Sequence, residues 1–136
     1  LDYVPNDALV AVHDGVRPFV SKDTINEAFE IAEKNGSAVP VIDEVDSLRR
    51  VFDGASQAVN RSEYKRVQTP QVFQSTILKN AYNQEFSSFF TDDASVVEQT
   101  TSHAISLCAG ERTNIKITTP DDMIFAQAIA QALKEE

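Results

Sequence analysis

The feature that most constrains the fold is a strand, a helix and a second strand near the start of the chain. Residues 8–13 (ALVAVH) form a short, almost wholly apolar run, which is typical of a strand buried on both faces. Ser21 can cap a helix that Gly36 can end. Residues 38–42 (AVPVI) indicate a second buried strand. This βαβ pattern predicts an α/β fold with a mainly parallel sheet.

The segment from about residue 45 to residue 68 departs from that pattern. Its apolar residues are sparse, and Asp53-Gly54 is typical of the two-residue turn of a β-hairpin. A hairpin with so little apolar surface is not stable alone. We therefore expect an arm that rests on another surface, and a second copy of the chain is the obvious candidate.

Helical periodicity returns after Pro70 and alternates with short apolar runs. The predicted features of this half are a helix capped by Ser75, a helix capped by Thr91, strands at residues 104–108 and 114–118, and a final helix that begins at Thr119-Pro120. In the final helix, the predicted buried stripe consists of Ile124, Phe125, Ala128 and Ile129. The chain of 136 residues is expected to form a single domain.

Composition limits the partners and the compartment. Twelve Lys and Arg against 21 Asp and Glu give a net charge of −9, which is the wrong sign for binding nucleic acid through its phosphates. The apolar runs are too short for a transmembrane helix, and no secretion leader is recognisable. The single cysteine, Cys108, fits a buried strand residue better than a nucleophile. These features favour a cytoplasmic protein with no nucleic-acid or membrane partner.

Polar residues gather where predicted strands end, which is where open α/β sheets bind ligands. Asp14 and Arg17 follow the first strand, and they can either meet a ligand or pair with each other. Pro70 keeps Thr69 out of the helical region, so the Thr69 hydroxyl can bind a ligand or cap a helix, and capping is the commoner role. His13 closes the strand and is expected to support the site rather than to act as a base.

Two later segments carry charge that could meet a ligand. Asp92 and Asp93 could hold a metal, but no third carboxylate or histidine is near, so the charged start of a helix is the better interpretation. Lys116 lies midway along a predicted strand, where a lysine is unexpected unless its ammonium group meets an anion. With the helix start at Thr119 it would form a phosphate-binding corner, and the alternative is a solvated strand residue. Two histidines, one cysteine and four glycines supply no metal-finger spacing, nucleophile set or glycine-rich phosphate loop.

These segments, in this order, resemble the C-terminal part of the 2-C-methyl-D-erythritol 4-phosphate cytidylyltransferase family. The resemblance runs from about residue 9 to residue 133. The matching motifs are residues 12–18 (VHDGVRP), 46–49 (DSLR), Arg61, 69–73 (TPQVF), 91–94 (TDDA) and 114–120 (NIKITTP). Each motif alone is weak, and their collinear order carries the resemblance.

The resemblance implies a three-layer, Rossmann-like nucleotidyltransferase sheet with helices on both faces and a protruding β-arm. It implies transfer of a cytidylyl group from CTP, which carries Mg²⁺ on its phosphates, to methylerythritol phosphate, with release of pyrophosphate. Arg61 and Lys116 resemble the cations that place the attacking phosphate. The other binding groups that it implies are Asp14, Arg17, Thr69, Thr91 and Ser47, the last standing where the family usually has threonine.

The resemblance also implies a homodimer in which the arm at about residues 45–68 completes the site of a second subunit. About three extra residues between Val41 and Asp46 set this chain apart from the family pattern. The glycine-rich CTP loop of the family lies in an N-terminal half, so residues 1–136 are expected to be the C-terminal part of one domain and inactive alone. Two alternatives remain open: a pentitol-phosphate cytidylyltransferase that acts on ribitol 5-phosphate, and a non-catalytic dimeric module that binds a sugar phosphate.

Overall fold

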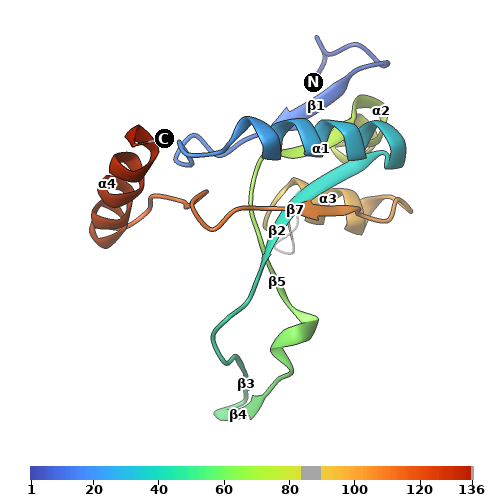
Figure 1. The fold of residues 1–136 in the computed structure, drawn as a ribbon. Coiled ribbons are helices and arrows are strands. Elements are labelled where there is room, and N and C mark those ends of the chain that lie inside the picture. Colours follow the sequence, from blue (N-terminus) through green and yellow to red (C-terminus); the bar gives the residue numbers. More distant parts are fainter. Residues whose placement is uncertain (84–89, 136) are drawn as a thin grey trace.

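A computed structural model describes residues 1–83 and 90–135 of the chain. Within these residues, five strands form one sheet and two more form a separate hairpin. The sheet contains β1 (Leu9–Val12), β2 (Ser37–Asp43), β5 (Lys65–Val67), β6 (Gln71–Gln74) and β7 (Leu107–Ala109). The hairpin contains β3 (Arg49–Phe52) and β4 (Ala55–Ala58). The helices are α1 (Lys22–Asn35), α2 (Ser75–Ala81), α3 (Asp93–Thr100), α4 (Pro120–Lys134) and the short 3-10 helix η1 (Arg61–Glu63) (Figure 1).

The sheet is mixed rather than mainly parallel, which corrects the expectation from the sequence. β6 lies between β1 and β2 and runs antiparallel to both, pairing Val12 with Gln71 and Ala38 with Val72. β5 is also antiparallel to β2, whereas β7 is parallel to it. β1 and β2 are therefore parallel to each other, with α1 as the crossover that the βαβ pattern predicts. The sequence did not reveal β5 and β6 because strands of three and four residues carry too little periodicity.

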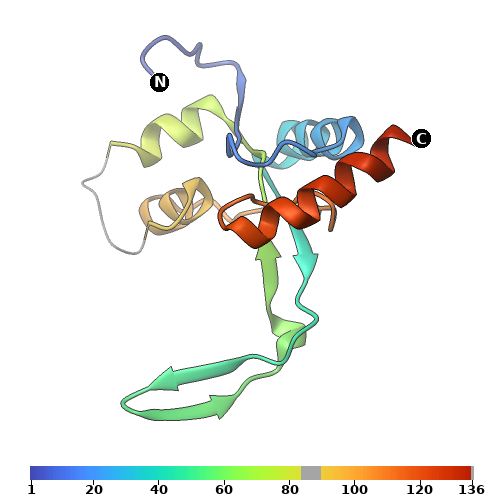
Figure 2. The same ribbon diagram turned by 90° about the vertical axis from the view of Figure 1, so that its left-hand side faces the viewer.

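Helices cover both faces of the sheet, which confirms the expected three-layer architecture (Figure 2). α1 packs on one face, where Ala28 and Ala32 meet Ala38 and Val72. α2 and α3 pack on the other face, in a cluster centred on Phe73. β1 is only partly buried, although burial on both faces was predicted, because it is an edge strand of the described sheet.

α1 begins and ends as the sequence predicts. The Ser21 side chain accepts a hydrogen bond from the Thr24 amide. Gly36 ends the helix with a φ of 91°, a backbone conformation that residues other than glycine rarely adopt. Cys108 of β7 packs in the same core and is 6% exposed. Burial raises the pKa of its thiol to about 11. Cys108 is therefore a core residue, as predicted.

The starts of α2 and α3 differ from the prediction. Ser75 is the first residue of α2 rather than its cap, and its hydroxyl accepts a 3.3 Å hydrogen bond from the Ala8 amide. Asp92, not Thr91, caps α3, through reciprocal bonds with Ser95. A carboxylate is at least as good a helix cap as a hydroxyl, so either neighbour satisfied the sequence pattern.

The predicted arm extends away from the body between β2 and β5 (Figure 2). Its outer hairpin turns at Asp53 and Gly54, which both have positive φ, as expected for this two-residue turn. Every residue of β3 and β4 is exposed, and Val51 reaches 76%. The two strands of the arm therefore bury no core of their own.

The segment before α4 is extended, but it is not the predicted strand. Residues 114–118 belong to no described sheet, although the Ile117 amide donates a 2.9 Å hydrogen bond to the Val16 carbonyl. Exposure still alternates along the segment, with Ile115 and Ile117 less exposed than Lys116. The predicted facing of these side chains is therefore correct, while the predicted pairing is not.

α4 starts as predicted, with Thr119 as its cap and Pro120 as its first residue. Its predicted buried stripe is wrong, because Ile124 and Phe125 are 65% and 58% exposed while Ala126 is buried. α4 lies beside the sheet and belongs to neither of the two helical layers that cover the faces of the sheet (Figure 1). No helix in the described part of the chain has the length and apolar character to cross a membrane.

Candidate ligand site

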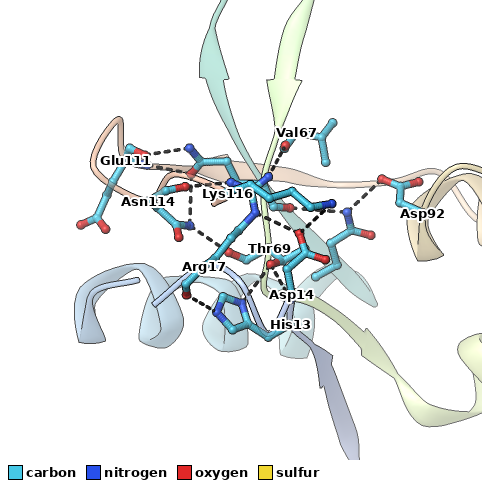
Figure 3. A network of polar contacts seen from close by, with 11 residues as sticks. His13, Asp14, Arg17, Val67, Thr69, Asp92, Glu111, Asn114 and Lys116 are labelled. Atoms are coloured by element: carbon cyan, nitrogen blue, oxygen red, sulfur yellow. Dashed lines mark hydrogen bonds and ion pairs between the residues drawn. The ribbon is translucent and has the colours of Figure 1, made fainter. Parts of the chain in front are cut away.

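A cavity of about 380 Å³ lies at the carboxyl end of β1, the edge at which α/β sheets bind ligands. Its walls are the loop after β1, the link between β5 and β6, the start of α3 and the extended segment after β7 (Figure 3). Five of the seven site residues that the resemblance implies line it, namely Asp14, Arg17, Thr69, Thr91 and Lys116. The fold thus brings four separate sequence motifs to one place.

Asp14 is the central charge of this cavity. Its Oδ2 accepts a 3.0 Å hydrogen bond from Arg17 Nε and lies 3.7 Å from Lys116 Nζ. The Arg17 side chain is 11% exposed, whereas that of Lys116 is 48% exposed. The ion pair between Asp14 and Arg17 therefore forms, and it forms on the wall of the cavity. Lys116 is the cation with the greater freedom to turn toward a ligand.

Arg17 is also held by two backbone carbonyls. Its Nη1 donates a 2.8 Å hydrogen bond to the Asn114 carbonyl, and its Nη2 donates a longer one, 3.5 Å, to the Val67 carbonyl. These bonds join the loop after β1 to the base of the arm and to the segment that carries Lys116 (Figure 3). Arg17 therefore fixes the relative position of three walls of the cavity.

Thr69 does not cap a helix, so the commoner role proposed from the sequence is wrong. Its Oγ1 accepts a 3.0 Å hydrogen bond from the Asp14 amide and lies 2.9 Å from His13 Nδ1. His13 Nε2 in turn lies 2.8 Å from the Arg17 carbonyl oxygen. His13 thus supports the site, as expected from its place at the end of the strand.

Two buried amides hold these walls together, namely Gln68, which no sequence motif includes, and Asn114, which begins the 114–120 motif without an assigned role. Gln68 is 4% exposed and Asn114 is fully buried. Asn114 Nδ2 donates to Gln68 Oε1 (3.3 Å) and to the Thr69 carbonyl (2.9 Å). The Gln68 side chain makes two hydrogen bonds to the backbone of Glu111. Its Oε1 accepts from the Glu111 amide at 3.1 Å, and its Nε2 donates to the Glu111 carbonyl at 2.7 Å. No local pattern identifies these residues, because their partners lie more than 40 positions away.

The start of α3 forms the opposite wall. Asp92 caps the helix and also accepts a 2.9 Å hydrogen bond from Gln71 Nε2. Asp93 accepts a hydrogen bond from the Tyr82 hydroxyl, and burial together with this bond raises the pKa of Tyr82 above its ordinary range. In the part of the chain that the structure describes, no three His, Cys, Asp or Glu side chains come together as a metal site. Asp92 and Asp93 therefore lie at the start of α3, where the sequence predicts a charged helix start.

The phosphate-binding corner expected at Thr119 is not formed. The backbone amides of Thr118 and Thr119 each donate a 2.9 Å hydrogen bond to Asp122 Oδ2, and these bonds hold the pKa of that carboxyl below its usual value. A carboxylate of the chain itself therefore occupies the anion position at the start of α4. Lys116 lines the cavity instead, without Thr119.

Arg61 and Ser47 lie on the arm, outside the cavity. Arg61 begins η1 and donates a 2.6 Å hydrogen bond to the Val45 carbonyl. With Lys65 it lines a separate hollow of about 240 Å³. Ser47 is exposed in the link between β2 and β3. Within one chain, the structure does not bring either residue to Lys116.

The motifs that build this cavity can be compared with those of known proteins. The 2-C-methyl-D-erythritol 4-phosphate cytidylyltransferase family matches residues 1–132. The chain belongs to this family. A 2-C-methyl-D-erythritol 4-phosphate cytidylyltransferase from Bacteroides thetaiotaomicron is 51% identical over 129 residues, and one from Bacillus velezensis is 41% identical over 135 residues. The two alignments cover 95% and 97% of this chain but 58% of either cytidylyltransferase, so the chain spans little more than half of their length.

Solved cytidylyltransferase structures have the same fold. The enzyme from Thermus thermophilus superposes with a TM-score of 0.79 at 36% identity, over 90% of this chain and 62% of that one. The enzyme from Francisella tularensis gives a TM-score of 0.83 at 27% identity, over 95% and 62% respectively. The expected Rossmann-like nucleotidyltransferase architecture is therefore confirmed.

Proposed function

We propose that the protein carrying these residues transfers a cytidylyl group from CTP to the phosphate of 2-C-methyl-D-erythritol 4-phosphate and releases pyrophosphate. In this proposal, the chain supplies the side of the site that holds the acceptor phosphate. The observation that carries it is the convergence of Lys116, Arg17 and Thr69 on one cavity at the carboxyl end of β1, in a chain of this family.

The chemistry suits such a cavity. A phosphate oxygen that attacks a second phosphate needs no strong base at neutral pH, but it needs alignment and compensation of negative charge. Lys116 can provide a point charge, since its only ion pair in the described structure is the loose one with Asp14. Arg17 provides a second positive charge that its carbonyl and carboxylate partners keep in place. The two cations would offset the field of a chain whose net charge is −9.

We infer that Arg61 and Ser47 act in the site of a second subunit. Both are on the arm, which extends away from the cavity of its own chain (Figure 2). The arm exposes apolar side chains that a partner could cover, including Val51 at 76% and Phe52 at 39%. A symmetric exchange of arms would place one Arg61 beside each Lys116. This arrangement would require the homodimer that the resemblance implies.

The carboxylates of the cavity do not fit a resident Mg²⁺ ion. Asp14 is engaged by Arg17 and Lys116, Asp92 caps α3, and Asp93 accepts from the Tyr82 hydroxyl. We therefore propose that Mg²⁺ enters only with CTP, bound to its phosphates. We propose further that CTP is held mainly by residues outside this chain, which covers 58% of the length of its relatives. Residues 1–136 would then be the C-terminal part of the catalytic domain, inactive alone, in a cytoplasmic enzyme whose free thiol stays reduced.

The test is an assay of the complete reading frame that contains these residues. Purified protein is incubated with CTP, Mg²⁺ and either 2-C-methyl-D-erythritol 4-phosphate or ribitol 5-phosphate, and pyrophosphate release is measured. We expect release with the methylerythritol substrate and little with ribitol 5-phosphate. A preference for ribitol 5-phosphate would favour the pentitol-phosphate enzyme. Binding of either acceptor without pyrophosphate release would favour the non-catalytic module.

A further inference from the structure

The ring of His13 makes a hydrogen bond on each side. Nε2 lies 2.8 Å from the Arg17 carbonyl oxygen, and Nδ1 lies 2.9 Å from Thr69 Oγ1. A carbonyl oxygen can only accept, so Nε2 carries a hydrogen. In the neutral ring, Nδ1 therefore has no hydrogen and accepts one from the Thr69 hydroxyl. The Arg17 carbonyl thus decides the tautomer of His13.

This tautomer fixes what Thr69 can offer to the cavity. Thr69 Oγ1 already accepts a 3.0 Å hydrogen bond from the Asp14 amide. With its own hydrogen directed to His13, the hydroxyl has only a lone pair left for a ligand. A lone pair repels a phosphate oxygen, which needs a donor. In the neutral state of His13, Thr69 is therefore an unfavourable neighbour for an anion in the cavity.

Protonation of His13 reverses this arrangement. Nδ1 then carries a hydrogen and donates to Thr69 Oγ1, so the hydroxyl hydrogen is released and can point to a ligand. We propose that His13 is a positioning residue that makes Thr69 a hydrogen-bond donor to the acceptor phosphate, and that binding of this phosphate takes up a proton on His13. The inference rests on the proposed function, since it assumes that a tetrahedral dianion occupies the cavity.

The groups around His13 come from three segments of the chain. Its own loop contributes Asp14 and Arg17, which pair with each other. The 65–74 segment contributes the uncharged Thr69, and the extended segment contributes Lys116, which lies 3.7 Å from Asp14 Oδ2. A bound dianion would attract the Lys116 ammonium group away from Asp14. The carboxylate of Asp14 would then be compensated less by Lys116.

The first experiment reads the tautomer directly. Long-range ¹H–¹⁵N spectra of the ¹⁵N-labelled complete protein contain one ring system for each histidine, and a His13→Gln variant identifies the signals of His13. Because histidine changes charge between about pH 5 and pH 8, spectra are recorded at both limits. At about pH 8 we expect the Nε2–H tautomer of His13, with Nδ1 accepting. The Nδ1–H tautomer at this pH would contradict the proposal.

The second experiment measures anion binding against pH. Sulfate is the probe because it is a tetrahedral dianion whose charge does not change in this range, and chloride keeps the ionic strength constant. We expect sulfate to bind about tenfold more tightly at about pH 5.5 than at about pH 8, the size of one added charge-assisted hydrogen bond. Equal affinities at the two pH values, or no sulfate binding at either, would overturn the proposal.

Variants separate the coupled pair from a general effect of pH. His13→Gln cannot gain a proton and Thr69→Val has no hydroxyl, so sulfate binding by either should not depend on pH. Thr69→Ser keeps the hydroxyl and should keep the dependence. His103→Gln should also keep it, because His103 bonds the Ser37 hydroxyl away from the cavity. A dependence that survives in His13→Gln would assign it to another group.

The outcome is distinguishable from that of the proposed function. If the complete protein releases pyrophosphate from CTP but its sulfate affinity does not depend on pH, only the proposed role of His13 is wrong. If sulfate affinity depends on pH through His13 but the protein releases no pyrophosphate, the proposed reaction is wrong and the anion site remains supported.

Discussion

Lys116 Nζ lies 3.7 Å from Asp14 Oδ2, so the lysine that could meet a ligand anion has a protein partner on the wall of the cavity. The contact is longer than a hydrogen bond, and both side chains are partly exposed, at 48% and 31%. Such a pair contributes little to stability, typically about 0 to 1 kcal/mol. The pair with Asp14 is therefore too weak to prevent Lys116 from turning to another anion.

Replacing Lys116 should impair acceptor binding far more than stability. In the complete protein, we expect Lys116→Ala to lower kcat/KM for the acceptor about tenfold to a hundredfold, since a charge-assisted contact of about 1.5–3 kcal/mol is lost. The KM for CTP should barely change, and the free energy of unfolding should fall by less than about 1 kcal/mol. Steady-state kinetics and urea unfolding measure these quantities.

The matched control is Lys134→Ala, which removes the same charge from the end of α4, away from the cavity. It should leave acceptor kinetics unchanged. If Lys116→Ala behaves like this control, Lys116 is a solvated residue and is not part of the site.

Arg61 should act only across a subunit boundary. Arg61→Ala and Lys116→Ala should each lower kcat/KM for the acceptor about tenfold to a hundredfold, yet a mixture of the two refolded or co-expressed subunits should be more active than either variant alone. Half of randomly formed dimers are mixed, and each has one intact site, so about a quarter of all sites should work. Arg61→Lys should rescue little, because a point charge does not reproduce the guanidinium fork.

The recovery is read by pyrophosphate release after mixing, with each variant alone as the reference. Sedimentation should show the intact complete protein to be a dimer at micromolar concentration. A monomer, or a mixture no more active than its components, would place Arg61 outside a shared site.

Asn114 should matter for stability because its amide group bridges two walls of the cavity. Asn114→Ala removes the donor to the Thr69 carbonyl and to Gln68 Oε1, both in a buried environment. We expect a loss of about 1–3 kcal/mol in the free energy of unfolding, measured with urea. Asn80→Ala, an exposed position on α2, should change it by less than about 0.5 kcal/mol. Similar losses in the two variants would show that the bridge contributes nothing.

Asp122 should make the start of α4 sensitive to acid. Hydrogen bonds from the Thr118 and Thr119 amides hold its pKa below the ordinary value of 3.8, so folding favours the ionised form. Its contribution to stability is therefore complete above pH 3.8 and is lost as the pH falls through the lower folded-state pKa. Asp122→Asn should lower Tm at neutral pH, and the difference from the parent chain should shrink as the solution is acidified.

Asp121→Asn is the control for this effect, because Asp121 is exposed in the same first turn and has none of these backbone bonds. At neutral pH, Asp121→Asn should lower the Tm of the parent chain by less than Asp122→Asn does. Thermal unfolding followed by circular dichroism across the acid range gives both curves. A Tm difference for Asp122→Asn that does not change with pH would argue against the ionised cap.

The sequence by itself determined the features that depend on neighbours in the chain. The Ser21 cap, the Gly36 stop and the Asp53-Gly54 turn follow from side chains that act within a few residues of themselves. The start of α4 at Thr119 has the same local origin. The order of the binding motifs identified the family for the same reason, since linear order needs no structure.

Tertiary structure decided what depends on residues far apart in sequence. The sheet is mixed rather than mainly parallel because β6 lies between β1 and β2 and is antiparallel to both. The four residues of β6 contain no pattern that identifies the strands it pairs with. Thr69 binds the Asp14 amide and His13 rather than a helix, because these groups lie 55 and 56 positions away in sequence. Gln68 and Asn114 look like ordinary polar residues until folding buries them against each other. Only the folded chain shows which polar groups share a buried space, because hydrogen bonds between distant segments leave no periodicity in the sequence.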